Sequence, residues 1–196
     1  MINKLAKRSL SVLALFSFFA LVYIVWSLIN IGYLPAPLSQ NHLGDNFMDF
    51  FNTNSFALRE DVYISWSSIY MPLNFFIAKF FIFEGCFHHA NNGLALRGCA
   101  IEQYAPLVAL HFISLALFAK KIKTDLNGNF WESIMIFFVL IFSLPALFLL
   151  ERGNYLIVFN FFLGLLVNTN SEKIKILLIS LMINIKQYFL LPVFLL

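Results

Sequence analysis

Residues 10–31 read LSVLALFSFFALVYIVWSLINI and contain no charged side chain. The run is long enough for the roughly 20 residues with which an α-helix crosses a bilayer. Lys4, Lys7 and Arg8 precede it without an acidic residue. A secretory signal also begins this way, but its apolar core is shorter and a small-x-small cleavage motif follows it. We therefore expect an uncleaved first membrane span with a cytoplasmic N-terminus.

The composition of the whole chain agrees with this interpretation. Of its 196 residues, 61% are apolar, 18% aromatic and only 12% charged, and the mean hydropathy is +0.82. In soluble domains about a quarter of the residues are charged. The 25 phenylalanines would leave too little polar surface to cover a soluble fold. The composition argues against a soluble enzyme, a nucleic-acid-binding protein and a disordered regulator, and makes membrane lipid the expected surroundings.

The basic residues indicate how the chain crosses the membrane. Further apolar runs occupy residues 62–83, 105–119, 130–150, 155–167 and 174–196. Most of the 13 basic residues lie in three short segments, namely the N-terminus, residues 120–123 and residues 173–175. The positive-inside rule places all three in the cytoplasm. An even number of crossings must separate each segment from the next, so one apolar run before residue 120 does not cross.

The run 62–83 is the weakest candidate for crossing, because it contains Pro72, Asn74 and Lys79. We expect it to form a non-crossing helix against the outer face, within an external loop of residues 32–104. If it crossed instead, the lysines at 120–123 would face outward. The predicted fold is all-α, a polytopic transmembrane helix bundle of about five spans in a single domain. Those spans are residues 10–31, 105–119, 130–150, 155–167 and 174–196. No polar flank follows the last run, so we expect the chain to be incomplete at its C-terminus.

Two carboxylates follow the first span directly. Asp45 and Asp49 are four residues apart, and on a helix they would share one face. There they could hold a proton, a metal ion or a substrate hydroxyl. The alternative is that both belong to the solvated start of a loop.

Three further elements carry polar or aromatic side chains at the ends of apolar runs. Tyr70 and Pro72 lie at the head of a helix, where the proline suits the first turn; the alternative is aromatic anchoring at the interface. Arg152 and Asn154 flank a glycine between two spans, and the alternative there is a tight turn with a positive φ. Lys186 lies within the last apolar run, which indicates a functional site unless its side chain reaches the interface.

These elements, in this order, resemble the GT-C superfamily of glycosyltransferases, and most closely the family 87 type, which includes mannosyltransferases. The order and topology carry the resemblance over the whole chain, and no single motif is specific. Family members usually have a proline after the lysine, where this chain has Gln187, and they usually run to about twice this length. The matching motifs are Asp49-Phe50-Phe51, Tyr70-Met71-Pro72-Leu73, Pro145 with Arg152-Gly153-Asn154, and Ile185-Lys186 with Tyr188.

The resemblance implies an inverting glycosyltransferase in the cytoplasmic (inner) membrane. It would move a hexose, with mannose as a candidate, from a polyprenyl-phosphate-linked donor to a glycan or glycolipid acceptor of the cell envelope on the outer face. Asp49, with Asp45 as the supporting or alternative carboxylate, would be the general base. Arg152 and Lys186 would bind the donor phosphate. Tyr70 and Asn154 would bind substrate. No cofactor is implied with certainty, and a divalent cation remains an open alternative.

Two functions of other classes remain open on the sequence. A transport protein for polysaccharide or lipid-linked sugars would use aromatic-rich spans and an intramembrane lysine equally well. An inactive fragment of a glycosyltransferase would explain the abrupt end of the chain. The loop carboxylate separates these alternatives, because transfer requires Asp49 whereas transport or scaffolding should tolerate its neutralisation.

The two cysteines of the chain lie with two histidines in one stretch of the predicted external loop. Cys86, His88, His89 and Cys99 together suggest zinc, but the Cys-x-His-His start is not a usual zinc spacing. Disulfides persist outside the cytoplasm. A Cys86–Cys99 disulfide, two unpaired thiols and a metal site are therefore the alternatives, with the metal site the weakest, and we assign no metal ligand.

Overall fold

The computed structural model describes residues 2–31, 46–59, 61, 63–64, 72–82, 86 and 92–185. All regular structure in these residues is helical, so the predicted all-α class is confirmed for the described part of the chain. The elements are α1 (Ile2–Ile31), α2 (Met48–Ala57), α3 (Pro72–Lys79), α4 (Gly93–Ala100), the 3₁₀ helix η2 (Ile101–Tyr104), α5 (Ala105–Asp125), α6 (Phe130–Ile141), α7 (Leu144–Arg152), α8 (Leu156–Asn168) and α9 (Glu172–Ile185).

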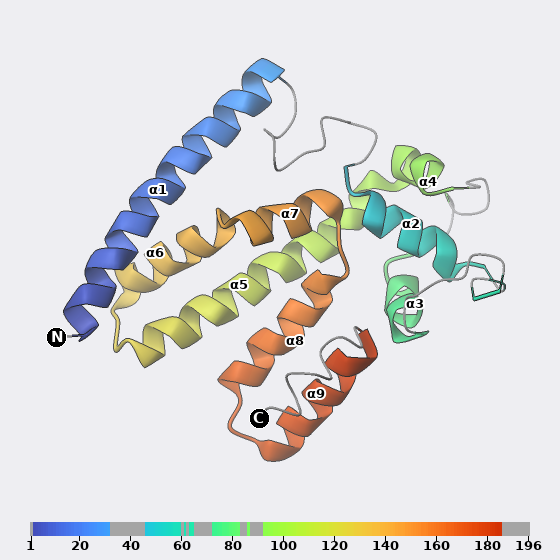
Figure 1. The fold of residues 1–196 in the computed structure, drawn as a ribbon. Coiled ribbons are helices and arrows are strands. Elements are labelled where there is room, and N and C mark those ends of the chain that lie inside the picture. Colours follow the sequence, from blue (N-terminus) through green and yellow to red (C-terminus); the bar gives the residue numbers. More distant parts are fainter. Residues whose placement is uncertain are drawn as a thin grey trace.

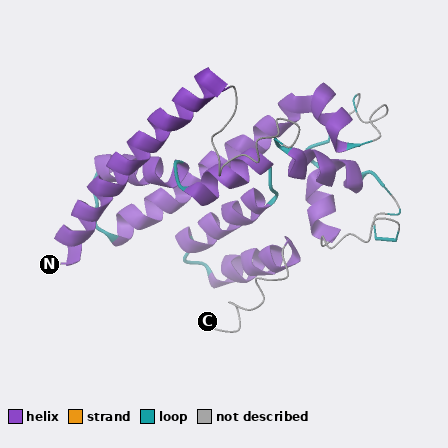
Figure 2. Cartoon of the chain, turned by 45° about the horizontal axis from the view of Figure 1, so that its top comes forward, coloured by secondary structure: helices purple, strands orange, loops and turns teal. Residues whose placement is uncertain are grey.

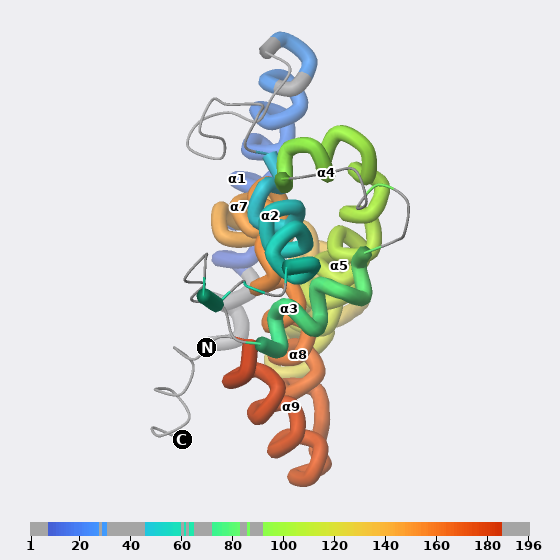
Figure 3. Tube along the Cα trace, turned by 90° about the vertical axis from the view of Figure 1, so that its right-hand side faces the viewer, coloured from blue at the N-terminus to red at the C-terminus, as the bar shows by residue number. Residues whose placement is uncertain are grey.

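The longer helices form an elongated bundle, and three short helices gather at one end of it (Figure 1). α5 packs against α6 and α8, α1 lies against α6, and α9 packs against α8. The turns at the ends of the bundle connect these helices almost directly (Figure 2). Figure 3 looks onto the end where α2, α3 and α4 lie in front of α5 and α7. This end also contains the turn between α7 and α8.

α1 exposes apolar side chains around most of its circumference. Phe16 is 67% exposed and Ile29 is 77% exposed, whereas Ser17, Ile24 and Ser27 are buried. A helix that is apolar all round belongs in a membrane or in the core of a large protein. Among the described residues, two segments are long and apolar enough to cross a bilayer, namely Arg8–Ser27 and Gly93–Asp125. The first of them lies largely within the predicted span 10–31.

The predicted span 130–150 consists of two helices. α6 and α7 would pass together as one apolar span, but their axes differ by 56°. Ser143 separates them, and its Oγ accepts a hydrogen bond from the Ala146 N–H at 3.4 Å. Pro145 lies within the first two positions of α7. Because proline has no N–H and its ring clashes with the carbonyl four residues earlier, α6 cannot continue through it.

Five spans are not confirmed by the described helices. Two are long and apolar enough to cross a membrane, or three if the bent pair is counted. α8 has 13 residues and α9 has 14, which corresponds to roughly 20 Å of helix against a hydrocarbon core of about 30 Å. The predicted start at Ala105 agrees with α5, although this helix runs to Asp125. Residues 186–196 of the last predicted span lie outside the described residues.

The predicted external loop, residues 32–104, contains more helix than expected. α2 and α4 lie within it, and the sequence did not predict either of them. In the run 62–83, the described helix is confined to Pro72–Lys79, with Pro72 as its first residue, as expected. Its eight residues span roughly 12 Å, which is too short to cross a bilayer. Asp61, Tyr63 and Ile64 are in turns.

Candidate functional site

α2 begins beside the turn that joins α7 to α8. No side chain caps this helix, and Phe47 before it adopts a left-handed conformation with φ of 62°. The Phe47 N–H donates to the Glu151 carbonyl at 2.8 Å. The Phe47 ring lies 4.5 Å from the ring of Tyr104, measured between centroids. These contacts between distant segments, rather than a local capping residue, fix the position at which α2 begins.

Gly153 allows the α7–α8 turn to approach the first turn of α2. It ends α7 with φ of 66° and ψ of 36°, so the turn with a positive φ that was weighed from the sequence is present. A Cβ at this position would lie 2.9 Å from Phe50 Cβ and 3.2 Å from the Phe47 carbonyl oxygen. Only glycine meets both the conformation and the approach at low cost. The turn thereby brings Arg152 and Asn154 against α2.

The Asp49 carboxylate is held by two side chains from this turn. Arg152 Nη2 donates to Asp49 Oδ1 at 2.8 Å, and Asn154 Nδ2 donates to Asp49 Oδ2 at 3.0 Å. The side chains of Asp49 and Arg152 are 24% and 18% exposed. Asn154 Oδ1 accepts from the Leu156 N–H at 2.9 Å, which fixes the orientation of the amide. Both carboxylate oxygens are therefore positioned by donors from one turn.

A small polar cavity adjoins the carboxylate. Its volume of about 10 Å³ gives room for roughly one water-sized group. It lies where α2, α3, the start of α8 and the end of α9 meet. Its lining residues are Asp49, Thr53, Asn74, Asn154, Tyr155, Leu156 and Ile185.

Buried aromatic residues hold α2 in this position. Phe50 is completely buried and stacks on Tyr155, with ring centroids 5.8 Å apart and an angle of 14° between the rings. The Tyr155 hydroxyl donates to Asn54 Oδ1, and the Tyr104 hydroxyl donates to the Leu150 carbonyl. Stacked or tilted aromatic pairs stabilise a contact beyond the apolar area that they bury. The site is therefore built on packed helices.

The structure brings together three of the six residues proposed for catalysis and substrate binding. Asp49, Arg152 and Asn154 meet in one cluster. Asp45, Tyr70 and Lys186 lie outside the described residues, although Ile185, which directly precedes the lysine, lines the cavity. The sequence did not predict the ion pair of Arg152 with Asp49, since it assigned this arginine to the donor phosphate.

Sequence reasoning missed Thr53 and Tyr155 as lining residues, and it treated Asn74 only as a feature that weakens a membrane span. Thr53 Oγ1 donates to the Asp49 carbonyl at 2.6 Å, so its hydroxyl supports the first turn of α2. An asparagine within an apolar run is a signal that could have been used, because polar side chains in such runs often mark function. Thr53 and Tyr155 carry no comparable signal in the sequence.

Cys86 and Cys99 form a disulfide, with their Cα atoms 5.9 Å apart. Of the alternatives weighed from the sequence, this is the pairing that the structure contains. It attaches α4, which carries Cys99, to the segment that follows α3. In the part of the chain that the structure describes, no group of three or more His, Cys, Asp or Glu residues is placed to hold a metal ion.

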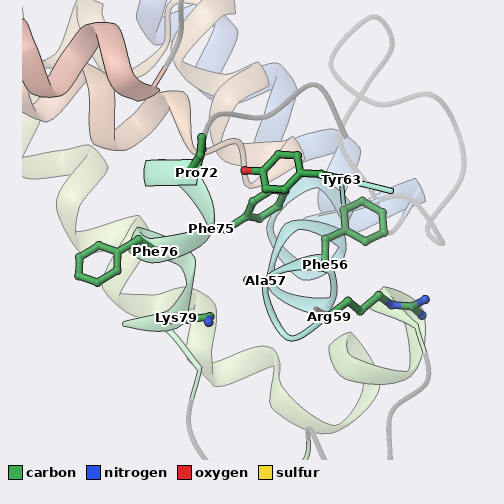
Figure 4. Close-up of a pocket in the computed structure, with 8 residues that line it drawn as sticks. All are labelled: Phe56, Ala57, Arg59, Tyr63, Pro72, Phe75, Phe76 and Lys79. Carbon is green, nitrogen blue, oxygen red and sulfur yellow. The ribbon is translucent and has the colours of Figure 1, made fainter. Parts of the chain in front are cut away.

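A larger cavity of about 270 Å³ lies between the end of α2 and α3 (Figure 4). The ring of Tyr63 packs edge-to-face on Phe75, with centroids 5.6 Å apart, and burial raises the pKa of the Tyr63 hydroxyl. Figure 4 shows Phe76 pointing away from these rings and Arg59 extending outward. The sequence did not predict this cavity. Its lining residues are Phe56, Ala57, Arg59, Tyr63, Pro72, Phe75, Phe76 and Lys79.

Comparisons of the chain with protein-family models, curated proteins and solved structures found no match. The resemblance to the GT-C glycosyltransferases therefore rests on the motifs of the sequence and on their order.

Proposed function

We propose that this chain is an inverting membrane glycosyltransferase of the GT-C type, similar to family 87. It transfers a hexose, with mannose as the first candidate, from a polyprenyl-phosphate-linked donor to a cell-envelope glycan or glycolipid. The observation that carries the proposal is the clustering of Asp49, Arg152 and Asn154 beside a polar cavity. The two partners lie 103 and 105 residues from Asp49 along the chain, and all three were chosen from the sequence for related roles.

In this mechanism Asp49 is the general base. Its carboxylate takes the proton of an acceptor hydroxyl while the hydroxyl oxygen attacks the anomeric carbon of the donor. The bond from that carbon to the phosphate oxygen breaks, and the electron pair leaves with the polyprenyl phosphate. A carboxylate has about four lone-pair sites, so the bonds from Arg152 and Asn154 leave room for the incoming hydroxyl. Positioned proton transfer of this kind contributes roughly 10²- to 10⁴-fold in rate.

The donor phosphate is assigned to Arg152 and Lys186. A guanidinium has five N–H donors in a fixed fork, so Arg152 can contact Asp49 and a phosphate oxygen together. Lys186 directly follows Ile185, which lines the same cavity as Asp49. Charge-assisted bonds to the phosphate would strengthen as its leaving oxygen gains charge. Tyr70 and Asp45 keep their proposed roles as a substrate-binding residue and as a second carboxylate.

We also propose that the chain crosses the inner membrane five times with its N-terminus in the cytoplasm. Support comes from the arrangement of the charged helix ends. Lysines lie at the end of α5 (Lys121 and Lys123) and at the beginning of α9 (Lys173). Both helix ends are on the lower side of Figure 1, away from α2 and the turn between α7 and α8. Under the positive-inside rule this arrangement supports an outer-face position for Asp49. The short α8 would then require local thinning of the bilayer.

The experiment is a transfer assay with the full chain in lipid nanodiscs. The donor is polyprenyl-phosphate mannose carrying a radiolabelled sugar, and the acceptor is the glycolipid fraction of cell-envelope membranes. We expect Asp49→Asn to lower transfer by roughly 10²- to 10⁴-fold. The matched control is Asp125→Asn, which changes a 56%-exposed carboxylate at the far end of α5 and should leave transfer unchanged.

Transfer by Asp49→Asn at the wild-type rate would refute the assignment. If Asp49→Asn stayed active while Asp45→Asn lost activity, the role of general base would be reassigned to Asp45. Transport of the lipid-linked sugar that tolerates Asp49→Asn, with no transfer by the wild type, would favour the transport function instead.

A further inference from the structure

Asn74 has the most unusual hydrogen bonding of the residues that line the Asp49 cavity. It is 1% exposed and lies in the first turn of α3. Its Nδ2 donates to the Ile185 carbonyl at 3.2 Å. Its Oδ1 is buried and has no hydrogen-bond partner among the described residues. A buried acceptor without a partner is destabilising and calls for an explanation.

The orientation of the Asn74 amide follows from its one hydrogen bond. The Ile185 carbonyl can only accept, so the NH₂ group must face it and Oδ1 must face another way. Because Asn74 lines the cavity shared with Asp49, Oδ1 is the polar atom with which it can meet a molecule entering there.

The cavity therefore offers two separate acceptors, the Asp49 carboxylate and Asn74 Oδ1. The amide of Asn154 already donates to Asp49, and the Thr53 hydroxyl donates to a backbone carbonyl. A single hydroxyl has only one O–H and can satisfy only one of the two acceptors. A group that satisfies both acceptors must carry two O–H donors close together, as a single water molecule or two neighbouring hydroxyls of a sugar do.

We propose that Asn74 determines acceptor specificity by binding the hydroxyl adjacent to the one whose proton passes to Asp49. The acceptor class is thus a sugar with a free vicinal diol. The small cavity has room for the one hydroxyl bound by Asn74, and the reacting hydroxyl stays at the partly exposed Asp49 carboxylate. This inference rests on the proposed function, since it assigns the neighbouring hydroxyl of the same substrate. A site that hydrogen-bonds a substrate hydroxyl strongly rejects the analogue that lacks it.

The test measures sugar binding to the full chain in nanodiscs by saturation-transfer NMR, without a donor. The probes are the methyl glycosides of mannose, glucose and galactose, each with its monodeoxy analogues. For the glycoside that binds best, we expect binding to depend on two adjacent hydroxyls. Removal of either hydroxyl should weaken binding tenfold or more. In Asn74→Leu, one of these two deoxy analogues should bind as well as the parent. The other should still bind weakly.

The matched control is His111→Leu. His111 is 2% exposed and its Nδ1 also has no hydrogen-bond partner among the described residues, but it does not line the cavity. The same two deoxy analogues should therefore bind weakly to this variant, as they do to the wild type. The wild-type panel keeps the proposal falsifiable even if Asn74→Leu does not fold. The inference is overturned if binding depends on no pair of adjacent hydroxyls in any glycoside, which is the result expected if the cavity holds only water. It is also overturned if Asn74→Leu keeps the wild-type pattern.

The transfer assay distinguishes this failure from failure of the proposed function. If transfer depends on Asp49 but Asn74→Leu does not change which deoxy analogues bind weakly, only the inference about Asn74 fails. If the wild type binds the diol as expected but transfers no sugar, the glycosyltransferase assignment fails and the sugar-binding role of Asn74 stands.

Discussion

α1 is a helix of 30 residues whose apolar side chains are largely exposed, whereas α2 has ten residues and buries seven of them, including Thr53 and Asn54. α1 has the composition that a bilayer stabilises. α2 has neither the length nor the hydropathy for a membrane, and it is held by contacts with α3, α4 and α7. The difference separates two tasks in one chain. The exposed apolar surface of α1 suits a lipid environment, and a short helix fixed by tertiary contacts positions the candidate catalytic carboxylate.

The largest difference between the two regions should appear when one phenylalanine is removed from each. Phe50 on α2 is completely buried, whereas Phe16 on α1 is 67% exposed. We expect Phe50→Ala to lower the free energy of unfolding by about 3–5 kcal/mol, the usual cost of truncating a buried aromatic residue. Phe16→Ala should change it far less. Unfolding by SDS titration in mixed micelles measures both, and equal losses would contradict the comparison.

A somewhat smaller effect is expected at Gly153, the glycine between α7 and α8 that packs against α2. Gly153→Ala must place a Cβ at positive φ and 2.9 Å from Phe50 Cβ. The left-handed conformation and the overpacking together should cost about 2–4 kcal/mol. The control is Gly98→Ala on α4, where the added Cβ would meet no described residue within 4 Å beyond its chain neighbours and the nearby backbone of its own helix. Higher helix propensity should there stabilise the fold by up to about 1 kcal/mol. The same SDS titration checks the pair. A harmless Gly153→Ala would show that α2 does not depend on this approach.

The smallest effect concerns two ion pairs. Arg152 and Asp49 are 18% and 24% exposed, and Lys121 and Asp125 are 39% and 56% exposed. Arg152→Gln should lower the free energy of unfolding by about 1–3 kcal/mol, because a hydrogen bond to a charged group is lost in a partly buried position. Lys121→Gln should cost about 0.5 kcal/mol or less, and added salt should weaken that contribution further. If the two losses measured at low salt were alike, the Asp49 cluster would not differ from an ordinary surface pair.

The same contrast explains which parts of the fold could be predicted from the sequence. Hydropathy located α1 and the start of α5, because the composition of a long apolar run is enough to indicate a membrane helix without knowledge of its tertiary contacts. It missed α2, whose start depends on a hydrogen bond from Phe47 to Glu151, a residue more than 100 positions away. It also missed the bend at Ser143, although Pro145 was already visible as the cause.

Part of the candidate site was predictable for a different reason. Asp49, Arg152 and Asn154 carry charge or an amide next to apolar runs, so their chemistry is apparent in the sequence. Their pairing was not apparent, because Gly153 permits an approach that only the folded chain reveals. The apolar run around Asn74 gave a signal that was not used, and the structure adds that its Nδ2 is bound to the Ile185 carbonyl while its buried Oδ1 has no partner among the described residues.

The central proposal is that the Asp49 cluster faces outward, opposite the lysine-bearing helix ends. Labelling by a membrane-impermeant maleimide in intact cells tests this directly. Cys86 and Cys99 are first replaced by serine, and Gly98→Cys or Thr124→Cys is then introduced at exposed positions near the cluster and near the lysines. We expect labelling of Gly98→Cys in intact cells, and of Thr124→Cys only after the membrane is permeabilised. The reverse pattern would contradict it.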